Sequence, residues 1–153
     1  MKKSMNQTKI SHTLNWMLLA MALIAIALFV IQLVGTLQAA QLFQRRLTDW
    51  QFLWAPNWVN YVLFLAIIIL GLMKSRIAIL ASLYYALQTF WFFFNVIFGD
   101  GNTFIAPTIL SYGGAICHYT LFIISLAALC LWMVELWRHI SRRKNIGVDF
   151  GVH

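Results

Sequence analysis

The sequence predicts an all-α integral membrane protein, a bundle of four transmembrane helices with both termini in the cytoplasm and an amphipathic interfacial helix between spans one and two. The first observation is composition, because 62% of the 153 residues are hydrophobic and only 10% are charged, whereas soluble domains have roughly 45–50% apolar and about 25% charged residues. The second is length. Crossings of about 20 residues each fill most of the chain, which predicts a single transmembrane domain over residues 1–153.

The third observation is the placement of the basic residues, which give the chain a net charge of +7. With a cytoplasmic N-terminus, four spans put nine lysines and arginines inside and only Arg45 and Arg46 outside, as the positive-inside rule requires. We therefore expect a cell membrane protein of the bacterial plasma membrane type, facing an anionic inner leaflet. Nucleic acid is not an expected partner, because the bases are not interleaved with exposed aromatics. The residues expected at lipid headgroups are Lys74, Arg76, Arg138, Arg142, Arg143 and Lys144.

The first span is expected at about residues 14–34, after a polar and basic start. Such a start also describes a signal peptide. This apolar run is too long for one, however, and bulky Leu37 stands where a cleavage site near Ala39 requires a small residue. We interpret the run as a retained span.

An amphipathic stretch over residues 38–54 follows Gly35, which interrupts the apolar pattern. One large apolar face opposite a polar one is typical of a helix that lies in the membrane interface. Pro56 is expected to end this helix, since the residue before a proline avoids helical angles. The apolar face comprises Phe43, Leu47, Trp50 and Trp54.

The second and third spans are expected at about residues 57–73 and 77–98, joined by a short KSR turn that makes them an antiparallel hairpin. The next apolar run, residues 104–137, is longer than one crossing needs. It is interpreted as an outer segment, either helical or re-entrant, followed by or continuous with a fourth span. The outer segment, the fourth span and a basic cytoplasmic tail are placed at about 104–112, 113–132 and 138–153.

The third span carries a polar and aromatic stripe that lipid tails cannot satisfy. Its residues recur at intervals of four, three and four, so that they share one helical face. We expect the other helices to cover this face and to form a polar cavity in the outer half of the bundle, together with Ser111 and His118 of the fourth segment. The candidate ligand-binding residues are Tyr84, Gln88, Trp91, Asn95, Ser111 and His118.

Two interpretations of these polar groups stay open. They can hydrogen-bond from helix to helix and fix the packing, or they can serve a ligand. His118 is either a group that titrates near neutral pH or a neutral histidine bonded to a serine or an amide. Glu135 is expected to pair with Arg138 or His139 on its own helix. The glycines expected to let helices approach closely are Gly71, Gly113 and Gly114.

No catalytic motif or metal-ligand spacing occurs in the sequence, and its two cysteines, Cys117 and Cys130, form no CxxC pair. We therefore expect no cofactor or metal, and a non-enzymatic membrane protein that acts by interaction, as an accessory, regulatory or immunity-type protein. Its expected partners are the lipid bilayer and a second copy or a larger membrane protein. The alternatives are a small-molecule transporter or ligand-binding bundle with an outward-facing cavity and, third, an intramembrane enzyme with His118 as base.

Overall fold

The computed structural model describes residues 2–44, 46–49, 57–98 and 109–148. These residues form helices and turns, with no strand among them, which confirms the predicted all-α fold. The four helices of this described part are α1 (Lys2–Leu42), α2 (Trp58–Leu72), α3 (Ile77–Phe98) and α4 (Ile109–Val148).

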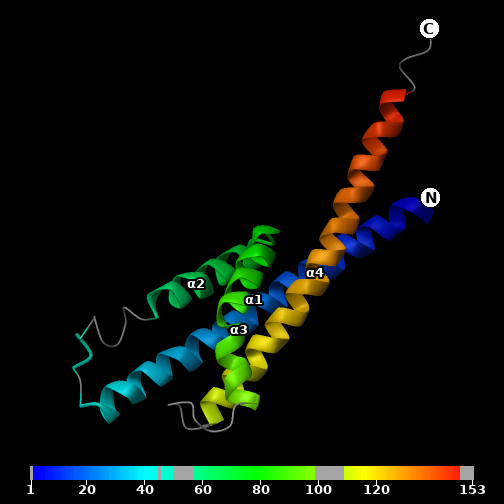
Figure 1. Cartoon of the computed structure of the whole chain (residues 1–153). Coiled ribbons are helices and arrows are strands. Elements are labelled where there is room, and N and C mark those ends of the chain that lie inside the picture. Colours follow the sequence, from blue (N-terminus) through cyan, green and yellow to red (C-terminus); the bar gives the residue numbers. More distant parts are fainter. Residues whose placement is uncertain (1, 45, 50–56, 99–108, 149–153) are drawn as a thin grey trace.

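Two long helices, α1 and α4, cross one another, and the α2–α3 hairpin packs beside them (Figure 1). The first turns of α1 and the last turns of α4 lie at the same end of the molecule (Figure 1). The prediction of two cytoplasmic termini requires this relation, although which side of a membrane this end occupies stays a prediction.

Three of the four described helices contain stretches long and apolar enough to cross a membrane, at Lys9–Leu42, Ile77–Asn95 and Tyr112–Ser141. Helix α2 has 15 residues and is therefore about 22 Å long at 1.5 Å per residue, less than the hydrocarbon core of about 30 Å. The protein is thus a helical bundle with three candidate membrane spans, and a crossing by α2 stays a prediction.

Helix α1 supplies one side of the core with a seam of buried residues spaced alternately by four and three. This spacing brings the side chains onto one stripe, as in helices that pack at a shallow left-handed angle. The residues of this seam are Leu14, Leu18, Met21, Ala25 and Leu28. Phe64 and Ile67 of α2, with Leu121 of α4, are among the residues that complete the same cluster.

The end of α1 differs from the prediction. The helix continues through Gly35 to Leu42, so residues 38–42 extend it and do not begin a separate interfacial helix. Thr36 stabilises this extension, since its hydroxyl bonds the Gln32 carbonyl and the Tyr61 hydroxyl, each at 2.9 Å. Gln44 follows with φ 51, a left-handed conformation that ends helices, and residues 46–49 form a turn. The remainder of the predicted interfacial helix, with Trp50, Trp54 and Pro56, lies outside the described residues.

The predicted KSR turn between α2 and α3 closes a Schellman motif. The Ser75 amide bonds the Leu70 carbonyl at 2.8 Å, and the Lys74 amide bonds the Gly71 carbonyl at 3.0 Å. Lys74 adopts φ 56 to make this possible. The Ser75 hydroxyl then accepts a hydrogen bond from the Ile77 amide at 3.4 Å, at the start of α3.

Helix α4 is continuous from Ile109 to Val148. Of the predicted outer segment, residues 109–112 are therefore the first turn of this helix, and residues 104–108 lie outside the described part. The helix also extends through residues 138–148, which the sequence analysis placed in the basic cytoplasmic tail.

Candidate functional site

Helix α3 carries polar side chains on two faces, and only one of them meets the rest of the bundle. The inward face holds Ser82 and Tyr85, which are buried, and Thr89, which is half-buried. On the outer face Tyr84 is 58% exposed, Trp91 is 69% exposed and Gln88 is also exposed. The expectation that other helices of the chain cover the outer face is therefore wrong.

That expectation is wrong because the inward face has the same residue spacing as the stripe on the outer face, so spacing alone does not show which face is covered. Ser82, Tyr85 and Thr89 also recur at intervals of three and four, so either face can form a packed stripe. The inward set combines small hydroxyl side chains with one aromatic. Its hydroxyl groups can bond the carbonyl of their own preceding turn, which an amide in a packed interior does less readily.

The inward face meets His118, which is fully buried in α4. The Thr89 Oγ1 lies 3.1 Å from His118 Nδ1 and 2.8 Å from the carbonyl oxygen of Tyr85. Aromatic rings surround the imidazole: Phe93 stacks on it with ring centroids 4.5 Å apart, and Tyr85 and Tyr119 approach its edges at 5.7 and 5.2 Å. The histidine is therefore part of a packed aromatic cluster.

Counting protons identifies the tautomer of His118. The Thr89 hydroxyl has one proton, which it donates to the Tyr85 carbonyl. It must then accept from His118, so Nδ1 carries the ring proton and Nε2 has the free lone pair. Nε2 is buried and has no hydrogen-bond partner in the described part of the chain. Of the two interpretations of His118, this geometry favours a neutral histidine bonded to a hydroxyl, here that of a threonine.

The structure does not bring the predicted ligand-binding residues together. Tyr84, Gln88 and Trp91 lie on the outer face of α3, whereas His118 is buried against the inward face. Asn95 is half-buried near the end of α3, and the side chain of Ser111 lies outside the described part. Neither Gln88 nor Asn95 makes a side-chain hydrogen bond to any residue that the structure describes.

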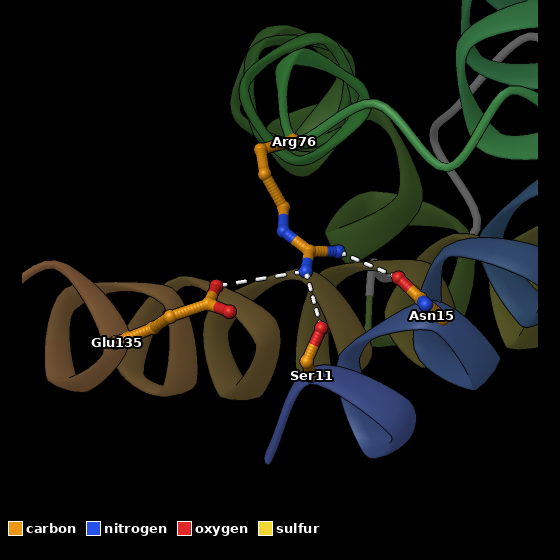
Figure 2. A network of polar contacts seen from close by, with 4 residues as sticks. All are labelled: Ser11, Asn15, Arg76 and Glu135. Carbon is orange, nitrogen blue, oxygen red and sulfur yellow. Dashed lines mark hydrogen bonds and ion pairs between the residues drawn. The ribbon is translucent and has the colours of Figure 1, made fainter. Parts of the chain in front are cut away.

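A polar network missed by the sequence analysis joins three helices near the α2–α3 turn (Figure 2). The Arg76 guanidinium donates to Asn15 Oδ1 at 2.9 Å and to the Ser11 hydroxyl at 3.4 Å, and it lies 3.5 Å from the Glu135 carboxylate. Glu135 thus pairs across helices with Arg76, in place of the expected pairing with Arg138 or His139. Arg76 reaches into the protein because α3 begins there and its side chain extends between α1 and α4 (Figure 2).

The other residues expected at headgroups either are exposed, which agrees with that role, or have side chains outside the described part. Lys74 and Arg138 are exposed, and the side chains of Arg142, Arg143 and Lys144 lie outside the described part. Lys74 also borders a groove of about 190 Å³ that is lined by His12, Asn15, Trp16, Leu19, Gly71 and Leu72. The groove is open at the surface beside the Arg76 network.

The predicted packing glycines sit at different kinds of contact. A Cβ on Gly71 would lie 2.8 Å from the Leu18 carbonyl oxygen and 3.0 Å from Ala22 Cβ, so α1 and α2 touch there through their backbones. A Cβ on Gly114 would approach Phe93 at 3.3 Å, and one on Gly113 would have only an ordinary contact with Ile31 at 3.9 Å.

Among the described residues, no three histidine, cysteine, aspartate or glutamate side chains gather where they could hold a metal ion. Cys117 and Cys130 are free thiols. No protein-family model, curated protein or solved structure matches this chain.

Proposed function

We propose that this protein acts by binding other membrane-spanning helices, as an accessory, regulatory or immunity-type membrane protein, and that the outer face of α3 is its binding surface. The observation that carries the proposal is the exposure of Gln88. This residue lies near the middle of a 22-residue apolar helix, at the depth where lipid offers no hydrogen-bond partner.

An amide at that depth is unfavourable unless another helix satisfies it. Polar side chains within membrane helices accordingly face protein or water and hydrogen-bond across helices. Inside this chain the described residues leave Gln88 without such a bond. A helix from another polypeptide supplies it in our proposal, and the neighbouring Tyr84 and Trp91 supply large contact surfaces on either side.

The alternative of a ligand-binding cavity needs Gln88, Asn95 and His118 to face a common space. Gln88 and His118 lie on different faces of α3, and the His118 ring is in contact with Thr89 and three aromatic rings. The alternative of an intramembrane enzyme needs His118 to act as base on a nucleophile. The Thr89 hydroxyl donates to the Tyr85 carbonyl and accepts from His118, and the buried Nε2 of His118 has no hydrogen-bond partner among the described residues. These contacts favour binding by the outer face.

Photo-crosslinking in native membranes tests the proposal. A photoreactive amino acid replaces Trp91, and the matched control carries it at Ile123, a residue of α4 that is also more than half exposed. We expect a protein adduct of defined size from position 91 and only lipid adducts from position 123. Lipid adducts alone from both positions would overturn the proposal, because the outer face of α3 would then be an ordinary lipid-facing surface.

A further inference from the structure

The outer face of α3 repeats every seven residues along the whole helix. Gln88 and Asn95 are seven residues apart, and Ala81 precedes Gln88 by seven. Four large residues recur with the same period, two of them between these three positions and one at each end. A seven-residue repeat with alternating steps of three and four is the pattern of a helix that packs along a left-handed seam with a partner helix. We call this set the α3 seam: Ile77, Ala81, Tyr84, Gln88, Trp91, Asn95 and Phe98.

Most of the α3 seam is left uncovered by the rest of the described chain, although Ala81 and Asn95 are half-buried and Ala81 packs against the core. Its large residues, Ile77, Tyr84, Trp91 and Phe98, are each more than half exposed. The inward contacts of α3 use a different set, which includes Ala78, Ser82 and Tyr85, all of them buried. The helix therefore has one seam that is packed within the chain and a second seam whose large residues are exposed.

We propose that the occupant of the α3 seam is the α3 seam of a second copy of this chain, in a parallel homodimer. This inference rests on the proposed function and names the partner. It follows from the chemistry of the two amides, because each has a carbonyl acceptor and an NH₂ donor. An amide is therefore complementary to another amide at the same position.

Membrane insertion determines how two α3 helices are oriented relative to one another. All copies of a chain insert with one orientation, so a two-fold axis along the membrane normal sets two α3 helices parallel and at equal depth. Residue 88 then faces residue 88, and residue 95 faces residue 95, which gives two amide pairs one heptad apart. A different protein would need hydrogen-bonding side chains at the same two depths, whereas a second copy provides them by symmetry. Buried amides at such positions fix the register and the number of helices in coiled coils.

The aromatic residues of the α3 seam are arranged to pack against a partner. The Trp91 ring is stacked on Phe94 of the next turn, with centroids 5.6 Å apart and planes 14° apart. This stacking restrains the exposed indole before any partner binds, so that less side-chain freedom is lost on association.

Resonance energy transfer between two fluorescent fusions of the full chain, reconstituted in lipid vesicles, tests this inference. We expect transfer that falls as lipid dilutes the protein, and a dissociation constant about tenfold higher or more when Gln88→Leu and Asn95→Leu are combined, since interhelical amide pairs are lost. The matched control is Thr120→Val, which removes an exposed hydroxyl of α4 that bonds only its own helix. An unchanged dissociation constant in the double variant, or no transfer in the wild type, would overturn the homodimer.

A cysteine scan supplies the register. In a chain whose Cys117 and Cys130 are replaced by alanine, single cysteines at positions 81, 84, 88, 91 and 95 should form intermolecular disulfides fastest, and those at 80, 83, 87 and 90 slowly. A maximum on the other set would overturn the α3 seam as the dimer contact.

Combination with the photo-crosslinks separates this inference from the proposed function. Adducts from position 91 to other proteins alone would overturn the homodimer and leave the proposed function standing, whereas lipid adducts alone would overturn both.

Discussion

The Arg76 guanidinium at the start of α3 lies 3.5 Å from the Glu135 carboxylate of α4, and both side chains are largely withdrawn from the surface, at 21% and 25% exposed. The same guanidinium bonds Asn15 of α1 at 2.9 Å. One side chain thus joins three helices from distant parts of the sequence. Because each contact is directional, the network sets the relative depth of these helices in the bundle.

Replacement of Arg76 by methionine should therefore lower the free energy of unfolding by about 1–3 kcal/mol, since it leaves Glu135 and Asn15 without their partner. Glu135→Gln should have a smaller effect, because the amide oxygen can still accept from Arg76. The measurement is unfolding in detergent micelles, with Arg138→Gln as the control at an exposed position. Equal effects of Arg76→Met and Arg138→Gln would contradict the role of the network.

Gly71 and Gly35 should respond in opposite directions to alanine. At Gly71 the new Cβ would meet a backbone oxygen of α1 at 2.8 Å, so α1 and α2 must separate, and overpacking of this kind lowers stability by about 1–3 kcal/mol. At Gly35 nothing lies within 4 Å of the new Cβ, and alanine should stabilise the helix by about 0.5–1 kcal/mol. Thermal unfolding of the two variants and the wild type measures both changes in stability. A Gly71→Ala protein as stable as Gly35→Ala would show that α1 and α2 are not in contact at this point.

Lys74 offers a substitution that should stabilise the turn. Its φ of 56 places a side chain in the left-handed region, at a cost of about 1–2 kcal/mol, and glycine avoids most of this cost while losing about 0.5–1 kcal/mol in chain entropy. Lys74→Gly should therefore raise the unfolding free energy by about 0.5–1 kcal/mol. Met73, the preceding residue, has φ −73, and Met73→Gly should lower stability by about 1 kcal/mol. The same sign for both variants would contradict the Schellman geometry.

The all-α class, the α2–α3 turn and the close approach at Gly71 could be predicted because each depends on local signals. Apolar runs, and glycines among large apolar residues, can be recognised from neighbouring residues in the sequence alone. The extension of α1 past Gly35 could not be predicted in the same way, because it depends on Thr36 reaching Tyr61 of α2, a contact between residues 25 positions apart.

Which face of α3 packs inward could not be predicted either, for a related reason. Both Tyr84–Gln88–Trp91 and Ser82–Tyr85–Thr89 have helical spacing, and the sequence does not reveal which stripe meets His118. Likewise, Arg76 was predicted at lipid headgroups from its position beside an apolar run. Its inward orientation depends on Asn15, Ser11 and Glu135 lying at one level, which is a property of the assembled bundle.

Substitutions at two consecutive residues, Gln88 and Thr89, test which face of α3 packs inward. Thr89→Val removes the hydroxyl that accepts from His118 Nδ1 and should lower the unfolding free energy by about 1–3 kcal/mol, because a buried donor loses its partner. Gln88→Leu should leave the isolated chain in detergent equally stable or slightly more stable, since Gln88 is exposed and has no hydrogen bond to the described residues. Consecutive helical residues point about 100° apart, so a loss of stability in Gln88→Leu with none in Thr89→Val would place the packed face of α3 about a quarter turn away from its position here.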